Sequence, residues 1–194
     1  QITAISESSQ EARKFIPAGI KIYYDYKSLI ASADIDVIFI SLPNQFASEA
    51  ACLSLQRGLH VFCEKPPART HAELLEVEKQ SLKFPELKLM YGFNHRFHLS
   101  VEEAKLLIDS NSLGRLINMK GVYGKSQMIS FNQTDWRTNR EASGGGILLD
   151  QGIHMLDLMR YLSGENFTEV LSFIDNAFWN FDVEDNAYVL MKSP

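Results

Sequence analysis

One short segment of the sequence carries ionisable side chains at helical spacing. Asp150, His154 and Asp157 lie at i, i+4 and i+7, which would place them on one stripe of a helix among mostly apolar neighbours. A carboxylate one turn from an imidazole can fix its tautomer and raise its basicity, which suits a general acid/base near neutral pH. The alternative is a structural histidine near a helix N-terminus, where Asp150 only favours the helix dipole.

Lys65 is the second residue with a chemical use. It follows the strand-like run 60–63 and precedes two prolines, which hold the backbone rigidly. A lysine at the carboxyl end of a strand can hydrogen-bond a substrate hydroxyl, and crowding can lower its pKa. Taken alone, the position of the residue favours the alternative of an exposed loop lysine.

The first half of the chain alternates strand-like and helix-like segments, which predicts a doubly wound parallel sheet. The apolar run 36–42 is expected to be a strand covered on both faces. Capping-box patterns at Ser8 and Thr70 indicate two helix starts. We expect strands over 2–5, 36–42, 60–63 and 88–93, and helices over 8–15, 45–57 and 70–82. Ligands would then bind beyond the carboxyl ends of the strands, where Glu7, Pro43, Lys65 and Asn94 fall.

The second half predicts a mixed α+β domain. The segment 116–123 alternates as a half-buried strand, with Ile117, Met119 and Tyr123 on one face. The other expected elements are helices over 100–109 and from about 149, and strands over 169–174 and 186–191. The sequence therefore predicts two domains, 1–97 and 98–194.

Composition narrows the class of protein. A chain that is 45% hydrophobic and 22% charged is typical of a soluble globular protein. A net charge of −5 with no basic stripe argues against a nucleic-acid partner, and no membrane span or signal sequence is visible, so we expect a cytoplasmic protein. Cys52 and Cys63 lack metal-ligand spacing and are expected to be buried, reduced thiols.

Three ordered motifs resemble one known family. The segment 60–66 (His-Val-Phe-Cys-Glu-Lys-Pro) resembles the Glu-Lys-Pro signature of the glucose-fructose oxidoreductase, inositol dehydrogenase and MocA family. Segments 92–97 and 144–154 are similar to the family's next two signatures. The resemblance implies a Rossmann domain followed by an α/β domain with a mostly antiparallel open sheet, which commonly supports oligomerisation. A homodimer or homotetramer is therefore expected.

The resemblance also implies a reaction. Lys65, Asp150 and His154 would line an active site beside the nicotinamide ring. Hydride would pass between nicotinamide C4 and a carbinol carbon of a sugar, nucleotide sugar or inositol-like polyol. His154 would be the acid/base, Asp150 would orient it or bind substrate, and Lys65 would polarise the reacting oxygen. The alternative is that Lys65 is the acid/base and His154 polarises the reacting oxygen.

The expected cofactor is NAD rather than NADP. Glu7 falls where family members usually place an acidic residue that can hydrogen-bond the ribose hydroxyls, and Ser8 stands where arginine is frequent. A solvated helix-start glutamate is the alternative for Glu7. A packed Trp beside a surface Arg is the alternative for Trp136 and Arg137. The resemblance implies a substrate contact from Arg96 and cofactor contacts from Glu7, Leu42, Pro43, Asn44, Glu64, Lys65, Asn94, Trp136 and Arg137.

The sequence departs from the family pattern at two points. The Gly-x-Gly-x-x-Gly phosphate loop and its strand are missing, so we interpret the chain as a fragment that binds dinucleotide poorly or not at all. Ala47 stands where relatives often carry a histidine.

Three rival functions remain. A metal-dependent hydrolase or lyase would use Asp150 and His154 with His95 and His98, without the compact ligand cluster that such sites need. A family member can also use bound NAD for a transient oxidation, with net hydrolysis, epimerisation or elimination. The third rival is a non-catalytic sugar-binding or scaffold protein. The run 149–157 makes a nucleotide sugar our leading substrate hypothesis.

Overall fold

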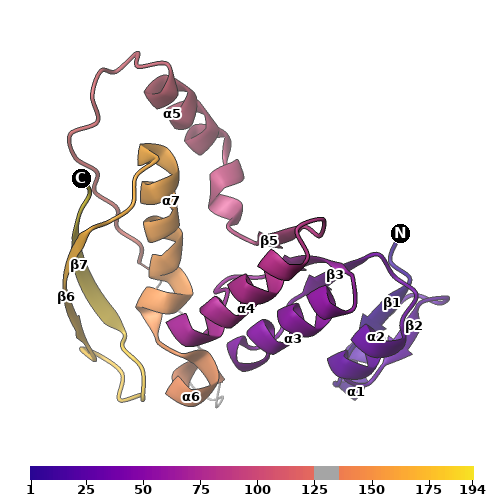
Figure 1. Ribbon diagram of the computed structural model, residues 1–194. Coiled ribbons are helices and arrows are strands. Elements are labelled where there is room, and N and C mark those ends of the chain that lie inside the picture. The colour runs from indigo at the N-terminus through magenta and orange to yellow at the C-terminus, as the bar shows by residue number, and fades with distance from the viewer. Residues whose placement is uncertain (125–135) are drawn as a thin grey trace. The chain divides into compact units, whose positions relative to one another are not determined.

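The computed structural model describes residues 1–124 and 136–194, which form two compact units. The first unit is Gln1–Gly92 and the second is Phe93–Pro194. Figure 1 shows the order of the elements, with strands and helices alternating through the first unit. The division falls directly after the last parallel strand.

The strands of the first unit are all parallel, as the alternating pattern predicts. β3 (Val37–Ile40), β4 (His60–Cys63) and β5 (Leu89–Tyr91) form a three-stranded sheet in that order. β1 (Ala4–Ser6) pairs with β2 (Lys21–Tyr23), which the sequence analysis did not identify. These strands form two separate sheets, because no strand in the described residues hydrogen-bonds to both β1 and β3.

Three of the four helices described in the first unit begin at a residue whose side chain accepts a hydrogen bond from a backbone amide of the first turn, whereas α3 (Asn44–Gln56) follows Pro43 without such a cap. The Ser9 and Thr70 side chains accept hydrogen bonds from the backbone amides of Ala12 and Glu73, close to the predicted helix starts. Asp25 caps a further short helix that was not predicted. The helices are α1 (Gln10–Arg13), α2 (Tyr26–Ser32), α3 (Asn44–Gln56) and α4 (His71–Lys83).

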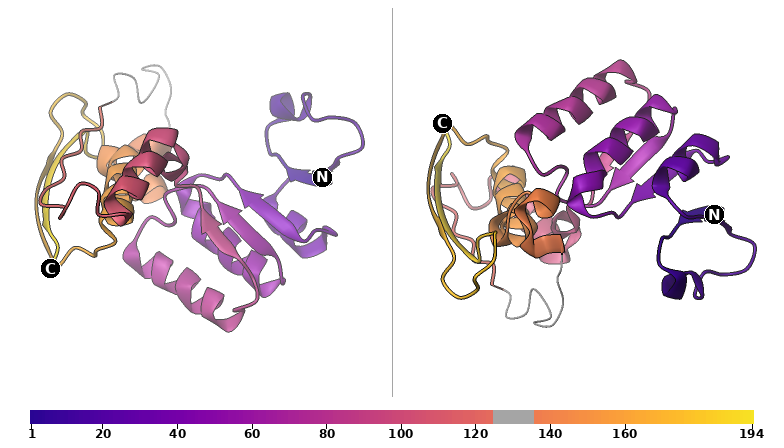
Figure 2. Two further views of the ribbon diagram at one scale, coloured as in Figure 1. Left: turned by 90° about the horizontal axis from the view of Figure 1, so that it is seen from above. Right: turned by 90° about the horizontal axis from the view of Figure 1, so that it is seen from below.

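The core of the first unit lies between the three-stranded sheet and two helices. Figures 1 and 2 show α3 and α4 together on one side of β3, β4 and β5. Leu55 and Val77 are fully buried there against Ile38 and Val61. Burial of each such side chain contributes about 1.5–3 kcal/mol. The expectation that β3 is covered on both faces is wrong for the described residues: Phe39, on the opposite face, is 75% exposed.

The second unit combines helices with one antiparallel pair of strands. β6 (Glu169–Asp175) and β7 (Asn186–Lys192) pair along their whole length, as predicted. The helical elements are the 3₁₀ turns η1 (Asn94–Phe97) and η2 (Trp136–Thr138), the π turn η3 (Leu148–Gly152), and α5 (Leu99–Asp109), α6 (Arg140–Ser143) and α7 (Ile153–Ser163). Among the described residues, no helix is long and apolar enough to cross a membrane.

The predicted strand over 116–123 is not formed. A strand needs a ladder partner for its backbone groups, and the described residues provide none for this segment. Ile117 and Tyr123 are exposed and Met119 is half-buried, so the predicted buried face is not formed. The segment instead runs close to α7: a Cβ on Gly121 would lie 3.0 Å from the Met159 side chain.

Candidate functional site

The polar residues predicted for the first unit lie at the carboxyl ends of its parallel strands. The Glu64 amide donates to the Ile40 carbonyl at 2.9 Å, and the Gly92 amide donates to the Cys63 carbonyl at 2.8 Å, so the ends of β3, β4 and β5 are tied together. Lys65 follows directly, is half-buried, and is joined to Pro66 by a cis peptide bond.

Gly92 makes room for the Glu64 carboxylate. A Cβ at position 92 would lie 3.1 Å from Glu64 Oε2 and 3.2 Å from Oε1, closer than most real contacts of a Cβ. The carboxylate therefore sits against the backbone at the end of β5. Together with Lys65, it gives this edge of the sheet one negative and one positive side chain next to each other in the chain.

Two further predicted cofactor residues start helices. Asn44 is the first residue of α3 and is buried, directly after Leu42 and Pro43 at the end of β3. Glu7 Oε1 accepts a hydrogen bond from the Ser9 amide at 2.7 Å, ahead of α1. Glu7 therefore makes the helix-start contact that is the alternative to ribose binding. A contact between Glu7 and a ribose stays a prediction. Ala47 is buried within α3.

In the second unit, the glycine run at 144–146 permits a close crossing of two backbone segments. Gly144 ends α6 in the left-handed conformation, with φ of 87°. A Cβ on Gly146 would lie only 1.9 Å from the Glu184 carbonyl oxygen. That carbonyl accepts from the Ile147 amide at 2.9 Å, and the Glu184 carboxylate accepts from the Leu148 amide at 3.3 Å. Glu184 therefore caps the helix that carries the predicted catalytic residues.

That helix begins with a π turn. Asp150 lies in η3, so regular α-helical spacing holds only from Ile153 onward, and the i, i+4 relation to His154 crosses a wider turn. The Asp150 carboxylate accepts from Gln151 Nε2 at 2.7 Å. His154 is the second residue of α7 and is only 5% exposed. Single π turns within helices are frequent at functional sites.

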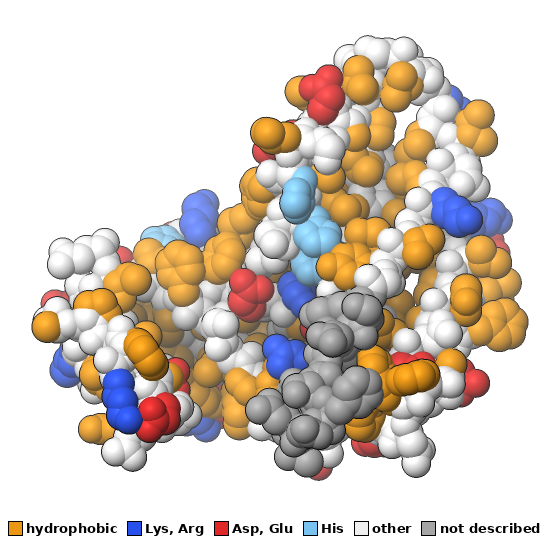
Figure 3. All heavy atoms as spheres, turned by 180° about the vertical axis from the view of Figure 1, so that it is seen from behind, with side chains coloured by type: hydrophobic (Ala, Val, Ile, Leu, Met, Phe, Trp, Pro, Cys, Tyr) orange, Lys and Arg blue, Asp and Glu red, His pale blue; other side chains and the backbone are white. Residues whose placement is uncertain are grey.

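The His154 ring is held by neighbouring aromatic rings. The His95 ring stacks on it with centroids 4.0 Å apart and planes inclined by 13°. The Phe93 ring meets it edge-on, at 6.3 Å and 87°. Tyr123 is a third near-parallel ring, 5.8 Å from His95. Adjoining histidine side chains are visible at the surface in Figure 3.

Arg96 and Asp157 form an ion pair beside these rings. Arg96 Nε donates to Asp157 Oδ2 at 2.8 Å, and its Nη2 donates to the other carboxylate oxygen, so the contact is bidentate. The hydrogen bond to Asp157 raises the pKa of Arg96. Its guanidinium also lies 5.1 Å from the centre of the Tyr161 ring. The predicted role of Arg96 in substrate binding stays a prediction; in the structure its guanidinium joins η1 to α7.

The remaining predicted contacts are placed as follows. Asn94 is exposed at the start of η1. Arg137 lies 4.3 Å over the ring of Trp136 in η2, a contact between neighbours in the chain. His95 and His98 meet edge to face, and the described residues contain no group of three or more His, Cys, Asp or Glu side chains placed to hold a metal ion.

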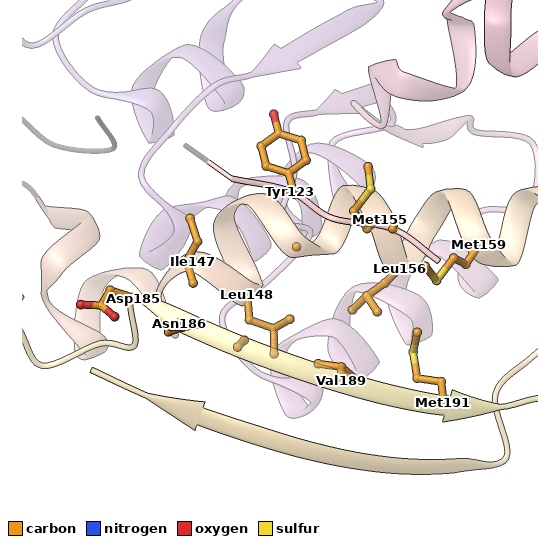
Figure 4. A pocket seen from close by; sticks show the side chains of 13 residues that line it. Tyr123, Ile147, Leu148, Met155, Leu156, Met159, Asp185, Asn186, Val189 and Met191 are labelled. Atoms are coloured by element: carbon orange, nitrogen blue, oxygen red, sulfur yellow. The ribbon is translucent and has the colours of Figure 1, made fainter. Parts of the chain in front are cut away.

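A separate cavity of about 170 Å³ lies between α7 and β7. Figure 4 shows Leu156 and Met159 of α7 facing Val189 and Met191 of β7 across it. Asp185 lines one end. Its carboxylate already accepts hydrogen bonds from three backbone amides, those of Ala177, Phe178 and Trp179. We therefore regard this cavity as part of the packing of the second unit.

Sequence reasoning missed several residues that shape this site. Glu184 lies far along the chain from the helix it caps, so no local pattern identifies it. Phe93 and Tyr123 act through ring contacts that depend on the fold. His95 lies within the motif 92–97 and is a candidate metal ligand in one rival function, but the sequence predicts no contact between His95 and His154.

The first unit defines a Rossmann-type nucleotide-binding fold, followed by a helical and antiparallel unit that carries a buried histidine. Residues 1–92 match the family described as oxidoreductases with an NAD-binding Rossmann fold, and residues 101–194 match the GFO/IDH/MocA C-terminal domain. The chain therefore belongs to the GFO/IDH/MocA oxidoreductase family, as the three motifs indicated.

Individual relatives agree with this assignment. The levoglucosan dehydrogenase of Pseudarthrobacter phenanthrenivorans is 34% identical over 142 residues, covering 73% of this chain and 36% of that protein. The D-glucoside 3-dehydrogenase of Escherichia coli is 32% identical over 167 residues, covering 82% and 44%. A structure of levoglucosan dehydrogenase in complex with NADH and levoglucosan superposes with a TM-score of 0.87 at 28% identity, covering 98% of this chain and 54% of that one. The chain thus spans about half the length of its relatives, or less.

Proposed function

We propose that the protein to which this chain belongs is an NAD-dependent dehydrogenase that oxidises a secondary hydroxyl of a sugar or polyol ring. The observation that carries the proposal is the buried His154 imidazole, fixed between two rings on a helix that begins with the Asp150 turn. The match to NAD-binding oxidoreductases over both halves of the chain supports it.

The residues present suit NAD. The Glu7 carboxylate at the end of β1 is chemically matched to ribose hydroxyls and would repel a 2′-phosphate. Asn44, Glu64 and Lys65 supply amide, carboxylate and ammonium groups at strand ends, where ligands of parallel α/β sheets bind. When bound, NAD would supply the hydride acceptor.

The chain's own residues would handle the hydroxyl group of the substrate. A ring nitrogen of His154 accepts the proton of the substrate hydroxyl. The carbon that bears this hydroxyl loses its hydrogen as a hydride, with both electrons of the carbon–hydrogen bond, and the product is a ketone. Asp150 orients the imidazole or binds a neighbouring substrate hydroxyl. Lys65 donates a hydrogen bond to the reacting oxygen, and this stabilises the alkoxide character that develops there.

The names of the relatives suggest the substrate class. One is a levoglucosan dehydrogenase, another a D-glucoside 3-dehydrogenase, and others are inositol 2-dehydrogenases and a glucose-6-phosphate 3-dehydrogenase. All these names specify a ring sugar or a cyclitol. A screen should therefore begin with anhydrosugars, glucosides and inositols, followed by the nucleotide sugars that the sequence motif suggested.

The test is NAD reduction by the full-length protein, followed at 340 nm with each substrate group. His154→Gln should lower kcat by about 10²–10⁴-fold, the usual value of a positioned acid/base. His98→Gln is the matched control, because His98 is exposed and belongs to the neighbouring turn. Retention of wild-type kcat by His154→Gln would remove His154 from the proposal. Product formation without NADH accumulation would instead support transient oxidation.

A further inference from the structure

The orientation of the His154 ring is not fixed by its own helix. The second side-chain torsion of histidine is broad, because it joins a tetrahedral carbon to a flat ring. The backbone of α7 therefore sets the position of the His154 side chain, and the neighbouring side chains must set the orientation of the ring plane. Since proton transfer depends on the direction of a ring nitrogen, the residues that fix this plane bear on the reaction.

Two rings constrain this plane from perpendicular directions. His95 lies against the face of the His154 ring at 4.0 Å with an inclination of 13°, whereas Phe93 presents its edge at 87°. A face contact opposes tilting of the ring, and an edge contact opposes its sliding. Both rings come from the short segment around η1, so this one segment carries both constraints.

The η1 segment is itself fastened to α7. Arg96, next to His95 in the chain, makes its bidentate ion pair with Asp157, which lies one turn beyond His154. The Asp157 side chain is 10% exposed and the Arg96 side chain is 39% exposed, so the pair is partly shielded from water on the Asp157 side. The guanidinium also packs on Tyr161 of the same helix. His95 is therefore held in register with His154.

We propose that His95 is a positioning residue for His154, acting through the face of its ring. The proposal rests on the proposed function for its effect on turnover, but not for the ring contact itself. His95→Phe keeps a flat ring and removes both nitrogens, whereas His95→Ala removes the ring. His98→Ala is the matched control, because His98 touches His95 edge-on and is exposed.

The first measurement is steady-state kinetics of the full-length protein. A misplacement of about 1 Å can cost about 10²-fold in rate, so His95→Ala should lower kcat about 10- to 100-fold with KM within about threefold. His95→Phe should restore kcat to within about threefold of wild type, and His98→Ala should match wild type. A wild-type kcat in His95→Ala would overturn the proposal, as would a loss in His95→Phe equal to that in His95→Ala.

The second measurement does not need turnover. Proton NMR of the histidine ring protons should show His154 signals shifted by the stacked ring, assigned through their disappearance in His154→Gln. These signals should move in His95→Ala and stay largely in place in His98→Ala. Unchanged His154 signals in His95→Ala would refute the ring contact. If the wild-type protein oxidises no sugar while these shifts behave as expected, the proposed function fails and the ring contact stands.

Discussion

Gly146→Ala should be the most damaging small substitution in the second unit. The alanine Cβ would lie 1.9 Å from the Glu184 carbonyl oxygen and 2.8 Å from both the carbon and the nitrogen of the same residue. All three are backbone atoms, so no flexible side chain can turn away. Since ordinary contact begins near 3.4 Å, the Glu184 segment must retreat by about 1.5 Å, the difference between 3.4 and 1.9.

That retreat removes the cap of the helix that carries Asp150 and His154. The Ile147 amide bond to the Glu184 carbonyl, now 2.9 Å, and the Leu148 amide bond to its carboxylate, now 3.3 Å, would both lengthen beyond hydrogen-bonding range. Overpacking strain costs about 1–3 kcal/mol, and each lost hydrogen bond costs about 1 kcal/mol. The free energy of unfolding should therefore fall by about 3–5 kcal/mol.

Urea unfolding of the full-length protein, followed by circular dichroism, measures this difference. With a slope of about 2–3 kcal/mol per molar, the midpoint should drop by about 1–2.5 M. Gly145→Ala is the matched control: its nearest neighbour is the Leu149 side chain at 3.2 Å, and we expect a loss below about 1 kcal/mol. Equal midpoints for the two variants would refute the reasoning.

Three further predictions concern single side chains. Burial tends to raise the pKa of Asp185, but three backbone amide donors lower it overall, so Asp185→Asn should destabilise the protein by about 1–2 kcal/mol at pH 7. The ionised carboxylate stabilises the fold above the unfolded pKa, and this contribution is lost as the pH falls through the lower folded pKa. The difference between the urea midpoints of the two proteins should therefore be smaller at pH 3 than at pH 7. Burial raises the pKa of Cys63 to about 12, so iodoacetamide at pH 8 should label Cys52 well before Cys63 in the folded protein. The two thiols should react at equal rates only after unfolding, and mass spectrometry measures both labels. Arg96→Lys cannot make the bidentate pair with Asp157 and should cost about 1–3 kcal/mol in urea unfolding; a wild-type midpoint would mean that the pair does not fasten η1.

Local patterns predicted most of the elements. The β4 strand was predicted at its observed bounds, and α3 and α4 within about a residue at each end, because apolar spacing and the Thr70 cap are local signals. β2 and α2 were missed because a three-residue strand and a seven-residue helix carry too little periodicity. The prediction of a strand over 116–123 is wrong because alternating apolar and polar residues indicate only that one face can be buried. A β-strand also needs a partner strand for its backbone hydrogen bonds.

The sequence offers Asp150 and His154 as candidates for the site, but it gives neither the residues that surround them nor their arrangement. Asp150 and His154 were found from spacing, yet the π turn between them and the Glu184 cap follow from backbone contacts over long separations in the chain. The same holds for the stack of His95 on His154, which depends on the ion pair that fastens η1 to α7. The type of each side chain can be read from the sequence, whereas the orientation of the His154 ring depends on packing in the folded structure.

Titration of the full-length protein with NADH, followed by the fluorescence of the bound nicotinamide, tests the central claim most directly. An NAD-dependent dehydrogenase should bind NADH saturably, and NADPH at least about tenfold more weakly if Glu7 contacts the ribose. His154→Gln should bind NADH as well as wild type does, because His154 is proposed to act on the substrate hydroxyl. If neither NADH nor NADPH binds, the account is contradicted, and the protein keeps the family fold without binding the cofactor.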